Sequence, residues 1–360
     1  MKRIIGTMSG TSLDGVDVAV LDTDMESVVA GPTYFRKYSK SEREIIARAV
    51  QLCGSANEVN LPEVKEAEKI VTQAHAEAIA TFLEENELKA EDIDLVAFHG
   101  QTLHHAPADR VTIQVGEAKS LAKELDVSIV HDFRSADVAA GGEGAPLVPI
   151  FHKLLLEKAN ATLPAAIVNI GGVANVTILK DDGSMVAFDT GPGNALINDW
   201  IASRTSKSQD DWGRIAGEGT VKDILVNQWL SDEYFAKKPP KSLDRDAFSI
   251  DPLDRFSLAD GSATLTAFSA RSIALGLEPY NLKALYVTGG GAHNRTMMRM
   301  LEEACGLKPM PVDELGFDGD YLEAYAFAYL AARVEQGLPI TFPQTTGVEE
   351  PLKGGEISNP

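Results

Sequence analysis

Hydrophobic and polar positions follow two different periods along the chain, and their order predicts an α/β protein. Short apolar runs at residues 3–8 and 16–22 are typical of β-strands, and the small residues between them predict a hairpin with a glycine-rich bend. Residues 41–53 and 63–86 instead have the helical spacing that places apolar side chains on one face. Further strands are expected at 94–100, 111–117 and 127–130, with a helix near 117–125. Strands that alternate with helices favour an α/β architecture.

The second half of the chain has the same rhythm. The expected units are strand–turn–strand at 164–179, strand–turn–helix at 184–202 and at 284–304, and a long helix at 320–337. Residues 205–260 are polar and predict an elaborated surface region with helical pieces.

Each half opens with a hairpin bent at a glycine-rich turn, which predicts two related lobes around a deep cleft. We expect the first lobe over 1–133 and the second over 134–344. The polar tail at 345–360 is rich in glycine and proline and predicts a loop or a loosely held end, with a return to the first lobe as an alternative.

Composition narrows the class of protein. The chain has 360 residues, 44% of them hydrophobic, and a formal net charge of −20. An acidic excess does not favour a nucleic-acid or anionic-membrane binder, although local backbone amides can still hold phosphate. Strand-like sequence starts almost at the first residue, and no apolar run is long enough to span a bilayer, so we expect a cytoplasmic protein.

The segment 9–17, SGTSLDGVD, is the first candidate for chemistry. Its two glycines allow backbone N–H groups to approach an anion, and Thr11 and Ser12 add hydroxyl donors. Asp14 or Asp17 could orient Mg²⁺ or a substrate hydroxyl. A Ser/Gly turn of an ordinary β-hairpin has the same local pattern.

Two further glycine-rich turns are candidates for nucleotide contacts. Gly171 and Gly172 join two strands, a pattern also typical of a simple hairpin turn. The three glycines at 289–291 stand between a strand and a helix, where they would allow a base or ribose to pack flat. Neither segment fits the P-loop or the dinucleotide-binding pattern.

A carboxylate follows the apolar strand in FDTGPGN. Asp189 stands at that strand end, where sites of α/β proteins are found, and a carboxylate there can act as a general base. The alternative is a cap on the helix that follows.

Isolated polar residues in apolar surroundings form the last group. The fork of Arg134 suits a carboxylate such as a lactyl group, or else an ion pair with Asp132 or Asp137. Glu323 lies in an otherwise apolar helix and requires a partner. His99 and His131 are candidates for buried, hydrogen-bonded structural histidines, with a catalytic role as the alternative. No spacing of histidine or cysteine is typical of a metal site, so no metal ligand is assigned.

Taken together, these motifs resemble a known family. The order of GTS turn, GG turn, DTGPGN and TGGG resembles the sugar kinase, Hsp70 and actin superfamily. MSGTSLDGVD, FHGQT, HDFRSADVAAGGEGAPLVP, NIGGVAN and VTGGGAHN are similar to the anhydro-N-acetylmuramic acid kinases over about residues 3 to 335.

The resemblance implies a two-lobed actin/hexokinase-like (ribonuclease H-like) ATPase fold with a central cleft, and a reaction. ATP, water and 1,6-anhydro-N-acetylmuramic acid would give N-acetylmuramic acid 6-phosphate and ADP in cell-wall recycling. Mg²⁺ would arrive with ATP, and the chain would form a homodimer. Asp189 would be the base that activates water, and Gln101, Arg134 and Glu323 would hold the sugar. The expected ATP-binding residues are Gly10, Thr11, Ser12, Leu13, Asp14, Gly15, Val16, Asp17, Gly171, Gly172, Gly289, Gly290 and Gly291.

Other functions share parts of this pattern. The wider superfamily has an Asp shortly before the first turn, where this chain has Met8, so the position of Mg²⁺ stays open. A kinase of a free hexosamine could use the same base without ring opening. An actin- or Hsp70-like ATPase would need no sugar, and a glycoside hydrolase would need no ATP.

Overall fold

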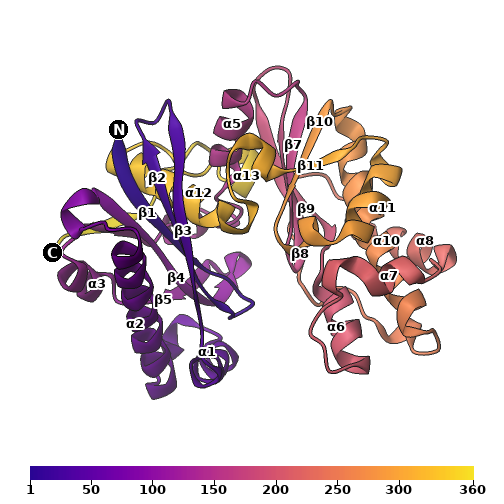
Figure 1. Cartoon of the computed structure of the whole chain (residues 1–360), viewed down its shortest axis with the longest axis horizontal. Helices are drawn as coiled ribbons and strands as arrows, with labels where there is room; N and C mark the ends of the chain where they lie inside the picture. Colours follow the sequence, from indigo (N-terminus) through magenta and orange to yellow (C-terminus); the bar gives the residue numbers. More distant parts are fainter. The chain divides into compact units, whose positions relative to one another are not determined.

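The computed structural model describes residues 1–360 and divides into two compact units (Figure 1). Unit 1 consists of Met1–Phe151 and Tyr321–Pro360, and unit 2 of His152–Asp320. Each unit contains one β-sheet with helices, which confirms the predicted α/β class. The boundaries differ from those expected at 133/134 and 344/345.

Unit 1 is built on a seven-stranded mixed sheet. Strands β12-β6-β4-β1-β2-β3 follow one another, and β5 pairs with β4. The predicted hairpin is present, since β1 and β2 pair antiparallel, while β1 and β4 pair parallel. The strands are β1 (Lys2–Ser9), β2 (Gly15–Thr23), β3 (Val28–Lys37), β4 (Leu95–Ala106), β5 (Val111–Val115), β6 (Ile129–His131) and β12 (Glu356–Ser358).

Helices cover this sheet because each has an apolar face to bury. One buried cluster joins Ile5 and Val18 of the sheet to Ile46, Phe82 and Leu121 of three helices. The helices of unit 1 are α1 (Lys40–Leu52), α2 (Pro62–Glu85), α3 (Ala118–Leu125), α4 (Ser135–Ala139), α12 (Leu322–Glu335) and α13 (Pro343–Thr346).

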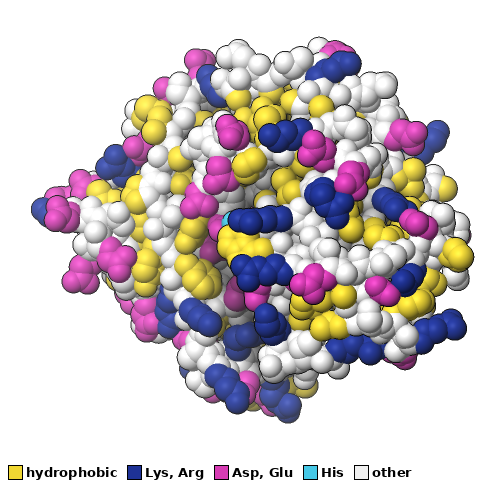
Figure 2. Space-filling view, turned by 45° about the vertical axis from the view of Figure 1, so that its right-hand side comes forward, with side chains coloured by type: hydrophobic (Ala, Val, Ile, Leu, Met, Phe, Trp, Pro, Cys, Tyr) yellow, Lys and Arg dark blue, Asp and Glu magenta, His cyan; other side chains and the backbone are white.

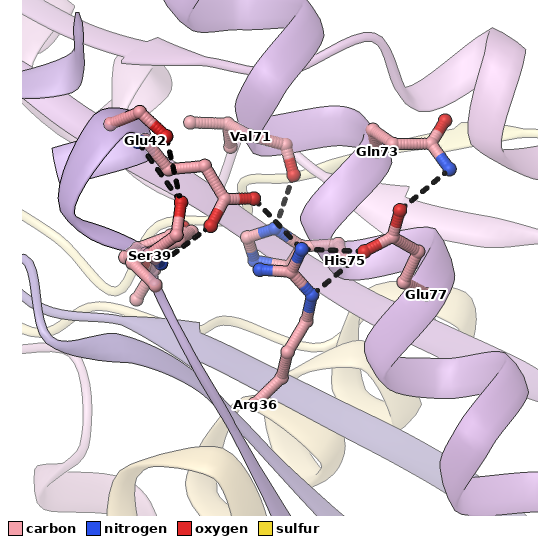
Figure 3. Close-up of polar contacts among 10 residues, drawn as sticks. Arg36, Ser39, Glu42, Val71, Gln73, His75 and Glu77 are labelled. Carbon is pink, nitrogen blue, oxygen red and sulfur yellow. Dashed lines mark hydrogen bonds and ion pairs between the residues drawn. The ribbon is translucent and has the colours of Figure 1, made fainter.

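An arginine on β3 connects the sheet to α1 and α2. A guanidinium N–H of Arg36 donates to Glu42 of α1 at 2.8 Å, and its Nε donates to Glu77 of α2 at 3.0 Å (Figure 3). Ser39 caps α1 and exchanges hydrogen bonds with Glu42 in a capping box. The junction between β3 and α1 is therefore fixed from both sides.

Helix α12 explains why the unit boundaries differ from the prediction. It was expected in the second lobe, but it packs on β1, β2 and β4 of unit 1. Every residue from Ala324 to Ala332 is buried, so the helix has no polar face to turn toward solvent over this stretch. An all-round apolar helix must lie inside a core, and the core available to it is that of unit 1.

The C-terminal tail also differs from the prediction. It was predicted as a loop or a loosely held end, yet β12 pairs antiparallel with β6, with Ile357 opposite Val130. His131 Nε2 and Ser358 Oγ share a hydrogen bond of 2.9 Å, which agrees with the structural role considered for this histidine. The tail returns to unit 1, as the alternative had it.

Unit 2 is built on a five-stranded mixed sheet in the order β11-β10-β7-β8-β9. The second predicted hairpin is present as β7 and β8, which pair antiparallel, while β10 pairs parallel with β7. The strands are β7 (Ala165–Ile170), β8 (Val173–Leu179), β9 (Met185–Pro192), β10 (Ala284–Thr288) and β11 (Pro309–Pro311).

A long buried helix, α10, supports this sheet. The polar region at 205–260 has the helical pieces expected of it, whereas α10 follows it and was not predicted. Phe268 of α10 shares a buried cluster with Val168 and Ile178 of the sheet. The helices are α6 (Ala195–Arg204), α7 (Arg214–Glu218), α8 (Asp223–Leu230), α9 (Glu233–Ala236), α10 (Leu258–Leu277) and α11 (Arg295–Cys305); α5 (Pro149–Lys158) contains the unit boundary.

Two surface features bear on the expected partners. None of the helices is long and apolar enough to cross a membrane. On the face shown in Figure 2, Lys and Arg side chains lie among Asp and Glu side chains.

Buried histidines make stability depend on pH. Burial lowers the pKa of His75 to about 4 and that of His152 to about 3, and it also lowers the pKa of His99. Below pH 6.5 the unfolded chain binds protons that the folded chain does not, so stability is present above that pH and is lost as pH falls toward the folded pKa values. Each histidine contributes a slope of up to about 1.4 kcal/mol per pH unit.

We therefore expect the urea midpoint of unfolding to fall between pH 7 and pH 5. His152→Gln should reduce this dependence, because glutamine does not titrate. A midpoint that stays constant over this range would contradict the expectation.

Candidate active site

The turn after β1 exposes the hydroxyl and carboxylate groups of the predicted phosphate-binding segment. Thr11, Ser12 and Asp14 are exposed, and Ser12 Oγ donates to Asp14 Oδ1 at 2.7 Å. The Leu13 N–H donates to the Gly10 carbonyl at 3.2 Å and closes the turn. Leu13, at φ +54°, takes a left-handed conformation within this turn.

The two glycines of this segment differ in their surroundings. A Cβ at Gly10 would meet only Ser12 Oγ, at 3.6 Å, so a ligand can approach its backbone closely. A Cβ at Gly15 would lie 2.3 Å from the Arg36 carbonyl oxygen, so this glycine is required for strand packing. Val16 is buried, and Asp17 is half-buried within β2.

A guanidinium–imidazole pair occupies another part of unit 1. Arg134 Nε donates to His99 Nε2 at 3.0 Å, and a terminal N–H of Arg134 donates to the Gly144 carbonyl at 2.7 Å. His99 Nδ1 lies 2.9 Å from the Gly100 carbonyl oxygen, which requires that nitrogen to carry the proton. His99 is thus a neutral acceptor toward Arg134.

The electrostatics agree with this assignment. Burial and the charge of Arg134 lower the pKa of His99 well below its usual value. Burial also lowers the pKa of Arg134 to about 10, although the carboxylates of Glu323 and Asp137 oppose the shift. At neutral pH the pair is one neutral imidazole beside one guanidinium cation.

The two aspartates considered as ion-pair partners of Arg134, Asp132 and Asp137, hydrogen-bond to other groups. Asp137 accepts from the Gly144 N–H at 2.6 Å and from Thr346 Oγ1 at 2.7 Å. The hydroxyl of Ser135 donates to Asp132. Sequence reasoning placed Arg134 in the site but did not find His99 as its acceptor; the pairing joins β4 to the start of α4.

The other two expected sugar ligands differ in exposure. Glu323 lies in the first turn of α12 and is partly exposed, and its charge acts on Arg134. Gln101 has 0% exposure, and both ends of its amide hydrogen-bond to other residues of unit 1. The structure thus brings Arg134 and Glu323 into one electrostatic environment, and Gln101 into another.

Asp189 lies inside β9 of unit 2, opposite Asn175 of β8, and not at the strand end where the sequence predicts it, because β9 continues to Pro192. It is not the cap of the following helix, because α6 begins at Ala195 and Asn194 occupies the N-cap position. The Leu243 N–H donates to Asp189 Oδ2 at 2.9 Å, and the side chain is partly exposed. A carboxylate with one oxygen fixed by a backbone donor has the defined orientation that a general base requires.

Residues from the polar region 205–260 contact the backbone and the side chain of Asp189, and the sequence did not point to them. The Asp189 N–H donates to the Lys241 carbonyl at 3.0 Å, and the Tyr234 hydroxyl donates to the Asp189 carbonyl. Lys241 Nζ lies 4.4 Å from the centroid of the Tyr234 ring. Burial lowers the pKa of Lys241, against the effect of the Asp189 charge. Nothing in a polar surface segment signals such contacts.

The Gly171–Gly172 turn holds the start of α6. The carbonyl of Gly172 accepts from the Gly193 N–H at 2.9 Å, and that of Gly171 accepts from the Asn194 N–H at 2.7 Å. The two carbonyls of the turn are therefore bound within the protein, whereas the backbone of Gly172 is exposed.

The three glycines after β10 have separate roles. A Cβ at Gly289, at φ +76°, would lie 2.3 Å from Asn169 Oδ1, and one at Gly291 would lie 2.3 Å from Ile170 Cγ2. A Cβ at Gly290 would meet nothing closer than Asn194 Nδ2 at 3.6 Å. Gly290 is therefore the position where a flat ligand group can approach. The N-terminus of the following helix α11 is capped by Asn294, whose Oδ1 accepts from the Met297 N–H.

Comparison with known proteins gives the family. Residues 2–359 match the family model described as anhydro-N-acetylmuramic acid kinase. The chain belongs to this family. A protein of that name from Methylorubrum extorquens is 47% identical over 375 residues, covering 100% of each chain, and one from Rhodopseudomonas palustris is 47% identical over 365 residues, covering 99% of each.

Membership in the anhydro-N-acetylmuramic acid kinase family makes the chain a kinase, and hence a transferase. A solved ROK family glucokinase from Streptomyces griseus, in complex with glucose and AMPPNP, covers 92% of this chain and 99% of its own, with 11% identity and a TM-score of 0.42. Structural similarity at that level carries no weight here, so the assignment to a family rests on the match of residues 2–359 to the family model.

The glycine geometry of this family member predicts unequal costs for two neighbouring substitutions. Gly291→Ala should lower the free energy of unfolding by about 1–3 kcal/mol, because its methyl group would overlap Ile170. Gly290→Ala is the matched control and should change stability by less than about 0.5 kcal/mol. Urea unfolding of both variants checks this, and equal losses would show that the close packing is not the cause.

Proposed function

We propose that this chain is an ATP-dependent kinase that opens the 1,6-anhydro ring of 1,6-anhydro-N-acetylmuramic acid with water and phosphorylates the released 6-oxygen. The observation that carries the proposal is the carboxylate of Asp189, oriented by a backbone donor within a strand of a kinase-family chain. The relatives' printed name supports the substrate.

The residues assign the steps as follows. Asp189 takes a proton from a water molecule as the water oxygen bonds to the anomeric carbon. The bond between that carbon and the 6-oxygen breaks, and the 6-oxygen attacks the γ-phosphorus of ATP. The bond from this phosphorus to the bridging oxygen breaks, which releases ADP. A single base is sufficient, because ring opening itself frees the nucleophile that is phosphorylated.

The turn at 9–17 supplies the groups for the nucleotide phosphates. The exposed hydroxyl of Thr11 can donate to a phosphate oxygen, that of Ser12 can do so by exchanging its bond to Asp14, and the open space beside Gly10 allows close backbone contact. Mg²⁺ commonly binds through one or two carboxylates together with phosphates and water, and the exposed carboxylate of Asp14 on this turn fits such a ligand. Mg²⁺ bound with ATP would offset the charge on the phosphates.

Arg134 is the group for the lactyl carboxylate of the muramic acid. Its Nε and one terminal N–H are held by His99 and Gly144, and its other N–H groups are left to bind a carboxylate. Glu323 would hold a hydroxyl or the amide of the sugar. The product, an amino-sugar phosphate, would enter amino-sugar catabolism as part of cell-wall recycling in the cytoplasm. The homodimer stays a prediction from the family resemblance.

The catalytic assignment predicts the effect of Asp189→Asn. The variant should lower kcat by about 10²- to 10⁴-fold, because asparagine cannot accept the proton. Release of ADP from Mg-ATP and the anhydro sugar, followed in a coupled assay, measures this. Circular dichroism and thermal unfolding of the variant provide the control for folding.

The same assay separates the other functions. ADP release that requires the anhydro sugar supports the proposal. Release without sugar would indicate an ATPase, and release only with a free hexosamine would replace the substrate. Sugar ring opening without ATP would indicate a hydrolase.

The carboxylate-binding role of Arg134 predicts a change in sugar specificity. Arg134→Lys keeps the charge but loses the fork, so the Kd for 1,6-anhydro-N-acetylmuramic acid should rise roughly tenfold or more. The Kd for 1,6-anhydro-N-acetylglucosamine, which lacks the lactyl group, should change less than about threefold. Titration calorimetry compares the two sugars. Equal losses of affinity for both would show that Arg134 does not bind the lactyl carboxylate.

A further inference from the structure

A buried network of hydrogen bonds connects the core of unit 1 to Gly10 in the turn that we propose for the phosphates. Tyr38 Oη lies 3.0 Å from Ser9 Oγ, which donates to Gln101 Oε1 at 2.6 Å. Gln101 Nε2 donates to the carbonyl of Gly10 at 3.2 Å and to that of Thr102 at 3.3 Å. The side chains of Tyr38, Ser9 and Gln101 are exposed by 2%, 1% and 0%.

The donor and the acceptor of each hydrogen bond in this network can be assigned. Because Ser9 donates to the glutamine oxygen, its own oxygen must accept from the Tyr38 hydroxyl. Burial raises the pKa of Tyr38 to about 12, so that hydroxyl remains a donor at neutral pH. The Gln101 oxygen therefore accepts from Ser9 and its nitrogen donates to two carbonyls, so both ends of the amide are engaged within unit 1.

A β-bulge in β4 lies between Gln101 and His99, the residue that accepts from Arg134. Between β1 and β4, Thr7 is opposite Phe98 but Ser9 is opposite Gln101, so β4 contains one extra residue. Gly100 takes φ +70° at this bulge, and a Cβ there would lie 2.6 Å from the Val115 carbonyl oxygen.

The bulge turns neighbouring polar side chains to opposite faces of the sheet. His99 lies against Phe327 of α12, with ring centroids 4.8 Å apart, on the side of Arg134. Gln101 meets Ser9 and Tyr38, and Tyr38 belongs to the core formed with α1 and α2. In an unbulged strand, residues two apart such as these would share a face.

We propose that Gln101 and Tyr38 are positioning residues for the nucleotide turn, and that Gln101 does not bind the sugar. The inference rests on the proposed function for the assignment of residues 9–17 to the ATP phosphates. It replaces the expectation that Gln101 holds the sugar together with Arg134 and Glu323.

The physical effect is preorganisation of the turn. The Gly10 carbonyl accepts from Gln101 and from the Leu13 N–H, which fixes the orientation of the peptide that follows Gly10. Donors that are already oriented toward an anion lose less entropy when it binds. Loss of the brace should therefore weaken nucleotide binding and leave sugar binding unchanged.

The test compares four variants in titration calorimetry with a non-hydrolysable ATP analogue and, separately, with the anhydro sugar. Gln101→Met removes the brace, and Tyr38→Phe removes only its first hydroxyl. Gln101→Glu keeps the shape but donates to Gly10 only when protonated. Gln114→Met is the matched control, because its amide bonds to Thr102 and Thr112 beside β4 without reaching the turn.

The proposal expects the nucleotide Kd to rise roughly tenfold in Gln101→Met and severalfold in Tyr38→Phe, with the sugar Kd within twofold. For Gln101→Glu, nucleotide affinity should improve between pH 8 and pH 5.5 relative to the wild type, as the buried carboxyl gains a proton and donates again. Gln114→Met should leave both Kd values within twofold.

Three results would overturn the proposal: a loss of sugar binding alone in Gln101→Met, no change in either Kd, or equal losses in all variants including Gln114→Met. If Gln101→Met does not fold, Tyr38→Phe decides. A wild-type chain that binds nucleotide but releases no ADP with the anhydro sugar would remove the proposed substrate, while the nucleotide Kd values would still judge the positioning role.

Discussion

A side chain at position 100 would collide with the Val115 carbonyl and would have to take a left-handed conformation, so β4 requires glycine there. The bulge that this glycine permits sets the direction of the polar side chains around it. His99 faces α12 and accepts from Arg134, whereas Gln101 faces the opposite core and holds Gly10. One inserted residue thus allows a single strand to support two kinds of group, the guanidinium that we propose for a carboxylate and the turn that we propose for phosphates.

Burial decides the charge state of these groups. Desolvation disfavours the charged form of an imidazole, so His99 remains neutral and offers an acceptor to Nε of Arg134. Arg134 bears part of the same cost, and the nearby carboxylates of Glu323 and Asp137 offset it. The arrangement keeps one cation in apolar surroundings with fixed geometry, which is what selective recognition of a planar carboxylate requires.

Unit 2 orients its carboxylate in a different way. Asp189 is part of a strand, and a distant polar segment contributes the Leu243 N–H to its side chain and Lys241 to its backbone. Close packing of Gly289 and Gly291 against the end of β7 leaves only Gly290 open. Three glycines that look alike in sequence therefore have different tasks, and the packing of neighbouring strands assigns them.

The sequence alone determined the α/β class, both hairpins, helix α2 and the position of Asp189 at a strand, because periodicity and turn residues act over a few neighbouring positions. Its motifs also gave the family. Tertiary structure decided the placement of α12 in unit 1, the pairing of β12 with β6, and the contacts of Lys241 and Leu243 with Asp189. A three-residue strand has too few positions to show a period, and a polar segment does not signal which carboxylate it will contact. The direction of the Gln101 amide likewise depends on Ser9 and Gly10, which lie about ninety residues away in sequence and meet it only when β1 and β4 pair.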